Sequence, residues 1–393
     1  MKDSPVTADG ARAAETPAMP PKYTTIHDVA KAAGVSTATV SNAFNSTGRI
    51  TPKTRERVLA VARQLRYYPN RHARSLASGS SRTLGVIVSD IQNPFFAVAI
   101  RSFEERVRKW RYEVIVSETN YDVALMTRAA ERMLEQKVRG VAILTSEMSA
   151  AWLEEIVRRD IPVACFDLDF SSEKAINIKA DYARGMRQVI EHLYDLGHRR
   201  IAFVGGRRSF RNILSRQENY VACMKALQLE PGPILIGNQR MDGGRTAGMS
   251  ILEMSPRPTA VAAMNDLTAV GLIAAFSEGG LRVPEDISVA GFDNTYLAEY
   301  FVPRLTTVDM HPDILGRTAA DALHEASSSP NAAAVEHTIR LSLVIGKSTG
   351  PNAELGPSAI RKREDLHSDS ALPSSESNVR EGDLVPLLSR GSD

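Results

Sequence analysis

The chain has 393 residues, with 48 Lys and Arg against 46 Asp and Glu, and 43% of its residues are hydrophobic. This composition is typical of a soluble globular protein of two or three domains, and it excludes collagen-like, mostly disordered and membrane-spanning chains. The only two cysteines, Cys165 and Cys223, exclude a disulfide scaffold and favour a reducing compartment.

The two ends of the chain differ in composition from its middle. Residues 1–22 are rich in Pro, Ala and polar residues and lack the continuous apolar stretch of a secretory signal. Residues 351–393 are rich in Ser and charged residues, and we expect both ends to be disordered. Since no run of about 18 apolar residues occurs, the sequence predicts a cytoplasmic protein without a membrane partner.

Positive charge is concentrated in one segment near the N-terminus. Between Lys22 and Arg82, eleven basic residues are opposed only by Asp28 and Glu56, so this segment carries +9 and the remainder of the chain −7. Such a field favours the neutralisation of phosphates and association with nucleic acid. Charge alone leaves a solvated basic surface open as the alternative.

Three short helices are predicted in this basic segment. The apolar spacing of residues 26–33 is that of one helical face, and Gly34 supplies the left-handed residue that ends the helix. Ser36 can cap a second helix that ends near Phe44, and a third is expected over Pro52–Leu65. A helix, a tight glycine turn and a second short helix make a helix-turn-helix.

The second of these helices is predicted to expose only small or amide-bearing side chains. Such a face lets a helix enter the major groove of DNA and meet the base edges. The side chains on it are Thr37, Ala38, Ser41, Asn42 and Asn45.

From residue 83 to residue 350, apolar strand-like runs alternate with amphipathic helical stretches. The runs include LGVIVS, YEVIVSE, GVAILT, IPVACF, RIAFVGG, TAVAAM and ISVAGF. Short continuous runs of this kind between helices indicate parallel sheets that are covered on both faces. In such folds a ligand binds near the carboxyl ends of the strands.

Several motifs resemble, in order, those of the LacI/GalR family of bacterial transcriptional regulators. TTIHDVAKAAGVSTATVSNAFN and TPKTRERVLAVARQLRYYPNRHARSLASGSSRTLGVIV are similar to the DNA-binding head and hinge of that family. The resemblance continues through RPTAVAAMNDLTAVG, LRVPEDISVAGFDN and LTTV to about Gly350. It implies an N-terminal all-α helix-turn-helix head and a two-lobed, periplasmic-binding-protein-like, doubly wound α/β effector domain.

The same resemblance implies a division of the chain into five parts. They are an N-terminal extension (1–22), a helix-turn-helix DNA-binding domain (23–68), a hinge helix and linker (69–81), an effector-binding and dimerisation domain (82–350) and a C-terminal tail (351–393).

The function implied by the resemblance is that of a transcriptional regulator, most simply a repressor. Such a protein binds palindromic double-stranded operator DNA as a homodimer, and a small-molecule effector in the cleft between the lobes controls it without a cofactor. Sugar-like effectors are the commonest in the family, and nucleobases and phosphorylated co-regulators also occur.

DNA contacts are also assigned by the resemblance. Thr37, Ala38 and Asn42 fall at base-reading positions, where Ala38 can make only an apolar contact, for example with a thymine methyl group. Leu76 falls where the family inserts a wedge into the minor groove, with an ordinary linker leucine as the alternative, and Ala77 replaces a lysine of many relatives. The full predicted set is Thr25, Ser36, Thr37, Ala38, Ser41, Asn42, Asn45, Arg49, Asn70, Arg74, Leu76 and Ala77.

The predicted effector site lies at strand ends. Arg216 falls where the family has its ligand-binding arginine, and Gln239 falls where some relatives have an aromatic ring, which indicates a different effector or a less apolar pocket. Two phenylalanines could stack on a ligand or pack in the core, and Asp266 is predicted to cap the helix that follows it. The full predicted set is Asp90, Asn93, Phe95, Phe96, Asp167, Arg216, Gln239, Asn265 and Asp293.

Two other functional classes remain as alternatives. An exported solute-binding protein would need a signal segment and would have no use for a basic head. An enzyme on the same lobes would need an acid–base or nucleophilic constellation around Asp167 or Asp293, and the sequence offers none. The GKST segment at 346–349 lacks the preceding glycine of a phosphate-binding loop, since position 341 is Leu.

Overall fold

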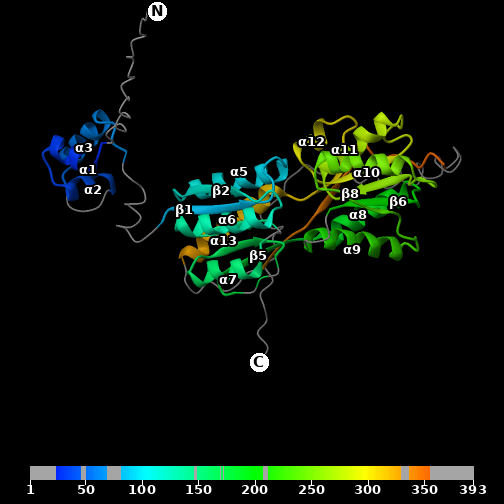
Figure 1. Cartoon of the computed structure of the whole chain (residues 1–393), viewed down its shortest axis with the longest axis horizontal. Helices are drawn as coiled ribbons and strands as arrows, with labels where there is room; N and C mark the ends of the chain where they lie inside the picture. Colours follow the sequence, from blue (N-terminus) through cyan, green and yellow to red (C-terminus); the bar gives the residue numbers. More distant parts are fainter. Residues whose placement is uncertain are drawn as a thin grey trace, which may run out of the picture. The chain divides into compact units, whose positions relative to one another are not determined.

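The computed structural model describes residues 24–45, 50–68, 81–145, 148–168, 170, 172–206, 211–328 and 336–354, without the side chains of residues 45 and 211–213. These residues belong to two compact units that divide between Ser80 and Ser81 (Figure 1). The predicted extension over residues 1–22, the hinge up to residue 80 and the tail from residue 355 lie outside the described residues.

The first unit, here called the head, contains three helices. They are α1 (Ile26–Ala33), α2 (Thr37–Asn45) and α3 (Pro52–Gln64). Their buried faces meet in one small core, which contains Val29, Ala30, Ala33, Val40, Ala43, Val58 and Ala62. The three helices predicted from the sequence are therefore confirmed.

Local capping explains where the helices of the head begin and end. Thr25 and Asp28 form a reciprocal capping box at the start of α1, and Gly34 ends that helix with a φ of 63°. The Ser36 hydroxyl accepts a 3.1 Å hydrogen bond from the Thr39 amide, as expected for the N-cap of α2. Thr51 caps α3 in the same way, with a 3.2 Å bond from the Thr54 amide.

The second unit consists of two α/β lobes. The sheet of the N-lobe has the strand order β11-β5-β4-β3-β1-β2. Its strands are β1 (Thr83–Val88), β2 (Glu113–Glu118), β3 (Val141–Leu144), β4 (Val163–Phe166), β5 (Ala175–Ala180) and β11 (Glu336–Ile339). Its helices are α5 (Pro94–Arg108), α6 (Val123–Glu135), α7 (Ala150–Arg158) and α13 (Pro312–Ser328).

The C-lobe repeats this architecture. Its sheet has the order β12-β10-β9-β8-β6-β7. Its strands are β6 (Ile201–Gly205), β7 (Ile234–Ile236), β8 (Ala260–Ala263), β9 (Ser288–Asp293), β10 (Thr306–Asp309) and β12 (Ser342–Val344). Its helices are α8 (Tyr182–Asp195), α9 (Arg211–Ala226), α10 (Met241–Leu252), α11 (Asp266–Glu278) and α12 (Tyr296–Tyr300).

Helices cover both faces of each sheet. In the N-lobe, α5 and α13 pack on one face, and α6 and α7 supply Met126, Met133 and Ile156 to the core on the other. In the C-lobe, α8 and α9 lie on one face and α10 and α11 on the other (Figure 1). The pairings are parallel except for that of β10 with β12, so the doubly wound α/β fold predicted from the sequence is confirmed.

Three chain crossings join the lobes. They lie between β5 and α8, between β10 and α13, and between β11 and β12. Because the chain returns twice, neither lobe is continuous in sequence, and both sheets are completed by the C-terminal segment. The lobes can therefore change their mutual angle only by bending these three short segments.

Each of the seven runs quoted above forms a strand. The described residues contain five further strands that are not among those runs: β5, β7, β10, β11 and β12. Most of them are short or contain several polar residues, as in TTVD, EHTI and SLV, so the apolar run that marks a buried parallel strand is absent from them. Among the described residues, no helix is long and apolar enough to span a bilayer.

Candidate functional site

The exposed face of α2 in the head carries the predicted base-reading side chains. Ala38 is exposed, Thr37, Ser41 and Asn42 are partly exposed, and Val40 beneath them is fully buried. Packing of α2 on α1 and α3 therefore fixes which face of the short helix can meet a partner. The Asn45 side chain and all of Arg49, Asn70, Arg74, Leu76 and Ala77 lie outside the described residues.

Two other predicted DNA contacts serve as helix caps in this structure. The Thr25 hydroxyl donates to Asp28 Oδ2 at 2.8 Å, and the Ser36 hydroxyl lies 2.9 Å from that of Thr39. Both residues therefore hold a helix N-terminus, and a helix N-terminus attracts phosphate through its unpaired amides and its dipole. Positive charge elsewhere in the basic segment reinforces that attraction.

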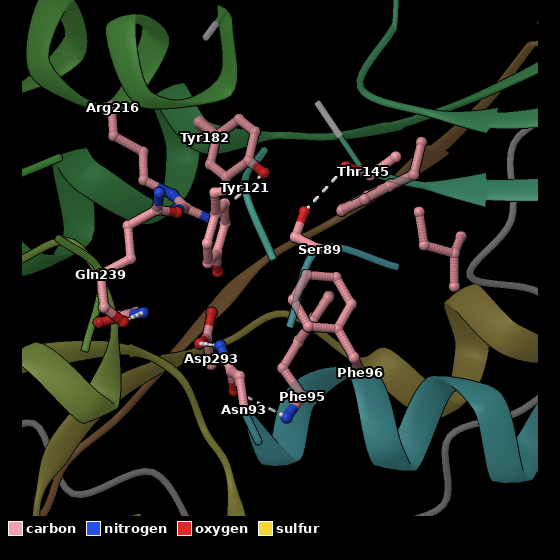
Figure 2. Close-up of a pocket in the computed structure, with 13 residues that line it drawn as sticks. Ser89, Asn93, Phe95, Phe96, Tyr121, Thr145, Tyr182, Arg216, Gln239 and Asp293 are labelled. Carbon is pink, nitrogen blue, oxygen red and sulfur yellow. Dashed lines mark hydrogen bonds between the residues drawn. The ribbon is translucent and has the colours of Figure 1, made fainter. Parts of the chain in front are cut away.

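Between the two lobes lies a pocket that is partly open to solvent. It forms where the carboxyl ends of strands from both sheets face each other, as the parallel topology requires. Its lining consists of Ser89, Asn93, Phe95, Phe96, Tyr121, Leu144, Thr145, Phe166, Tyr182, Arg216, Gln239, Asn265 and Asp293 (Figure 2).

One wall of the pocket is aromatic. The Phe95 and Phe96 rings lie edge to face with centroids 5.2 Å apart, and Phe95 stacks on Phe166 at 6.1 Å. The two phenylalanines begin α5 and are 4% and 9% exposed. They therefore pack in the N-lobe core and line the pocket as well, so the two interpretations of these residues are not exclusive.

Asn93 connects the aromatic wall to the other lobe. It caps α5, and its Oδ1 accepts a 3.0 Å hydrogen bond from the Phe95 amide. Its Nδ2 donates to Asp293 Oδ2 across the cleft at 3.5 Å (Figure 2). Asp293 ends β9 with a φ of 114°, a backbone conformation that aims its side chain into the cleft.

The opposite wall holds a buried guanidinium. Arg216 on α9 is 6% exposed, and its Nη2 donates to the Tyr182 hydroxyl at 3.3 Å. Its guanidinium carbon lies 4.6 Å from the centre of the Tyr182 ring and 5.3 Å from that of Phe292. Among the described residues its buried Nε has no hydrogen-bond partner, so one donor of a charged group is left for a ligand.

Asp167 orients Tyr182 from behind the pocket. The Tyr182 hydroxyl donates to Asp167 Oδ2 at 2.5 Å, while Asp167 Oδ1 accepts from the Ala180 amide at 3.0 Å. Burial, first of all, raises the pKa of Tyr182, and the neighbouring Asp167 raises it further. The phenol therefore stays neutral, and it donates its proton to Asp167 while its oxygen accepts the hydrogen bond of Arg216.

Burial also governs the carboxyl group of Asp293. Removal from water raises the pKa of Asp293 to about 7, although the charge of Arg216 and the Asn93 hydrogen bond favour its ionised form. Asp266 lies nearby, fully buried, and its pKa is raised well above the usual range by burial and then by the charge of Asp293. Two carboxyl groups therefore share one poorly solvated region of the C-lobe.

The predicted capping role of Asp266 is wrong. The N-cap of α11 is Asn265, whose Oδ1 accepts a 2.9 Å bond from the Thr268 amide. Asp266 instead accepts from the Thr295 amide at 2.7 Å and from the Thr307 hydroxyl at 2.5 Å. It turns inward because the strand ends of β9 and β10 offer it donors, whereas Asn265 already holds the free amides of the helix.

Seven of the nine predicted effector residues line the pocket, and two lie beside it. Asp90 and Asp167 are absent from its lining, because Asp90 pairs with Arg240 and Asp167 bonds to Tyr182. The prediction also missed several lining residues: Ser89, Tyr121, Leu144, Thr145, Phe166 and Tyr182. Since Ser89, Thr145 and Phe166 lie at or just beyond the carboxyl ends of β1, β3 and β4, the rule that already selected Asp90 could have found them.

Within the described residues, no group of three or more His, Cys, Asp or Glu side chains is placed to hold a metal ion.

Comparisons with known proteins match both units of the chain. Residues 25–70 match the family described as bacterial regulatory proteins, lacI family, and residues 190–349 match the periplasmic binding protein-like domain. The HTH-type transcriptional regulator DegA of Bacillus subtilis is 36% identical over 290 residues, which are 72% of this chain and 86% of DegA.

Solved structures give the same result. A lac repressor dimer bound to operator and the anti-inducer ONPF has a TM-score of 0.73 and 30% identity, with 84% of this chain and 100% of that chain covered. A LacI family transcriptional regulator from Enterococcus faecium with bound ribose has a TM-score of 0.62 and 29% identity, with 68% and 99% covered. The chain belongs to the lacI family of bacterial regulatory proteins, and it is a DNA-binding transcriptional regulator that carries a ligand-binding effector domain.

Proposed function

We propose that this protein is a repressor that binds a palindromic operator as a homodimer. A polyhydroxylated small molecule, such as a sugar, binds between the lobes and changes the affinity for the operator. The observation that carries the proposal is the presence of both Arg216 and Asp293 in one pocket with an aromatic wall. Hydroxyl groups of a sugar both donate and accept, so they suit an arginine and a carboxylate at once.

Amide side chains extend this hydrogen-bonding set. Asn93, Gln239 and Asn265 line the pocket, and each amide offers both a donor and an acceptor. Phe96 and Tyr121 provide flat apolar surface for the ring of a ligand. The related regulator from Enterococcus faecium was solved with bound ribose, which supports a sugar-like effector. A nucleobase is the second candidate, favoured by the number of aromatic rings, and a binding screen distinguishes the two.

In the head, α2 is proposed to read base edges in the major groove. Thr37, Ala38 and Asn42 are the base-reading residues, while Thr25, Ser36, Ser41, Asn45 and Arg49 position the helix through phosphates. The hinge residues Asn70, Arg74, Leu76 and Ala77 are proposed to meet the minor groove, with Leu76 as the wedge.

Coupling between the two sites needs only a difference in effector affinity between two lobe arrangements. The three crossings permit a change in the angle between the lobes, and the chain enters the N-lobe directly from the hinge. An effector that binds one arrangement more tightly raises the population of that arrangement. The coupling free energy between effector and operator binding is typically about 1–3 kcal/mol. Operator affinity then follows the effector concentration.

Replacement of Arg216 tests the pocket. A calorimetric screen against pentoses, hexoses, disaccharides and nucleobases is expected to find a ligand for the wild-type protein and to recover that ligand unchanged. Arg216→Ala removes a buried charged donor, so binding of the ligand is expected to weaken at least about tenfold, while DNA binding remains but no longer responds. Normal binding and response in the variant would refute the assignment of this pocket, and consumption of the ligand would favour an enzyme.

Replacement of Asn42 tests the head. With DNA selected from a random pool by the wild-type protein, Asn42→Ala is expected to weaken binding about 5- to 150-fold, since one bidentate base contact contributes about 1–3 kcal/mol. The slope of affinity against salt concentration serves as the control, because the loss of a base contact leaves the number of released counterions unchanged. A uniform loss across all DNA sequences would instead make Asn42 a phosphate contact, and a shallower salt slope would show that the variant has lost a basic contact as well.

The mass of the DNA complex tests the dimer. Tyr296, Tyr300 and Val302 are 60%, 78% and 88% exposed within seven residues of the C-lobe surface, a concentration of apolar surface that suits a protein interface. Sedimentation is expected to give two chains per palindromic duplex, and Tyr300→Glu is expected to lower dimer affinity without unfolding the lobes. One chain per duplex at micromolar protein would contradict the proposal.

The charge state of Asp293 gives a pH prediction. Because its pKa in the folded protein is about 7 and its unfolded value is near 3.8, the folded state holds an extra proton between these values. Stability contributed by the group is full below about pH 4 and is lost as pH rises through 7, by up to about 1.4 kcal/mol per pH unit. In urea unfolding, the free energy of unfolding of Asp293→Asn is therefore expected to rise relative to that of the wild type between pH 4.5 and pH 7. Parallel curves for the two proteins would contradict the raised pKa.

A further inference from the structure

An ion pair joins the two lobes just outside the pocket. Arg240 of the C-lobe donates from Nε to Asp90 Oδ2 of the N-lobe at 2.8 Å, across 150 positions of sequence. Arg240 directly follows the pocket residue Gln239, and Asp90 directly follows the pocket residue Ser89. The pair therefore crosses the cleft at the boundary of the ligand site.

A second N-lobe segment contacts the same guanidinium. Nη2 of Arg240 donates to Asn120 Oδ1, and the guanidinium carbon lies 5.9 Å from the centre of the Tyr121 ring. Asn120 and Tyr121 follow β2 and both have left-handed backbone angles, with φ values of 51° and 57°. Tyr121 also lines the pocket (Figure 2), so Arg240 lies over a ring of the pocket wall.

Burial makes this pair different from an ordinary surface ion pair. The Asp90 side chain is 1% exposed, whereas that of Arg240 is 36% exposed. The other oxygen of Asp90 accepts the Gln92 amide at 2.9 Å, so both oxygens are bonded. A carboxylate buried this deeply without its arginine would keep a large desolvation cost, and opening the lobes would relieve that cost by admitting water.

Arg240 makes an ion-paired contact across the cleft, and two other side-chain hydrogen bonds described above also join the lobes. That from Tyr182 to Asp167 lies beside the crossing between β5 and α8, where the chain itself connects the lobes. That from Asn93 to Asp293 is 3.5 Å long and involves a neutral amide. Hydrogen bonds between two ionised groups are shorter and stronger than those of neutral groups, so closure depends more on Arg240. The hydrogen bond to Asp90 is the first cause of the raised pKa of Arg240, and the guanidinium stays charged at any physiological pH.

We propose that Arg240 is a latch that holds the lobes closed over the pocket through Asp90 and Asn120, and so sets how readily the protein responds to its effector. The consequence for regulation rests on the function proposed above, whereas the closure itself does not. Without the latch the closed arrangement buries an unpaired Asp90 carboxylate, and the ratio of closed to open molecules is expected to fall at least about fivefold.

The distance between the lobes in the ligand-free protein tests the latch. Spin labels at two exposed helix positions, Glu131→Cys on α6 and Glu253→Cys at the end of α10, report it by electron–electron resonance in a Cys223→Ala background. Unlabelled protein is added in excess so that only distances within one chain contribute. Arg240→Ala is expected to add a longer distance, and Arg240→Lys to restore part of the short one.

A matched control shows whether the effect is specific to Arg240 or follows from the loss of any ion-paired arginine. Arg282 pairs with Asp286 at 3.0 Å inside the C-lobe, so Arg282→Ala removes an ion pair without touching the cleft. This control is expected to leave the distance distribution unchanged. If Arg240→Ala gives the same distribution as the wild type and the control, the latch is refuted.

A second substitution, at Asp90, distinguishes loss of the Arg240–Asp90 pair from a general destabilisation of the fold. Asp90→Asn removes the charge but keeps an acceptor for the Gln92 amide. Because closure of the Arg240→Ala variant is opposed by the unpaired carboxylate, adding Asp90→Asn to it is expected to restore part of the closed population. If the effects of the two substitutions on the open population are additive, the proposal is refuted, because substitutions of two residues in contact are expected to be non-additive.

The resonance experiment needs neither effector nor operator, so its outcome is independent of the proposed function. If the lobes open as expected but no compound of the screen binds, the latch stands and the effector class is wrong. If ribose or another hit binds, Arg240→Ala is expected to weaken it in proportion to the lost closed fraction. Unchanged affinity together with unchanged distances would leave Arg240 without the proposed role.

Discussion

Burial of charge between the lobes is the constraint on which the rest of the effector unit depends. Between the lobes, Asp90, Asp293 and Arg216 are buried and Asp167 is partly buried, and a charge that is removed from water needs a partner inside the protein. Asp167 finds Tyr182, and Asp90 finds Arg240 from the other lobe. Arg216 and Asp293 are paired less completely, and both line the pocket.

The topology of the sheets creates this situation. Parallel strands bring their carboxyl ends to one edge, and the edges of the two lobes face each other across three short crossings. Polar side chains at those ends, such as Ser89, Thr145 and Asp293, therefore meet although they are far apart in sequence. The same geometry makes the cleft sensitive to lobe angle, because every contact across it changes when a crossing bends.

Local sequence signals predicted much of this arrangement, and long-range pairing was what they could not predict. Gly34, Ser36 and Thr51 mark helix ends through bonds to neighbouring residues, and such bonds can be predicted from spacing alone. Asp266 was misassigned because its partners Thr295 and Thr307 lie about 30 and 40 positions away. No local sequence pattern marked Arg240, because its contact is with a carboxylate 150 positions earlier in the chain.

Two sites between the lobes, the outer Arg240–Asp90 contact and the inner site of Arg216 and Asp293, differ in how completely their polar groups are hydrogen-bonded. At the outer contact, both oxygens of Asp90 are bonded, so nothing there is left for a ligand. At the inner site, among the described residues, Arg216 Nε lacks a partner and Asp293 holds a long bond to Asn93. An effector bound at the proposed site would therefore gain most at the inner contact, where it would supply the missing acceptor for Arg216 and a closer partner for Asp293. Under the two proposals above, the outer pair and the ligand reinforce each other, since both act only when the lobes are together.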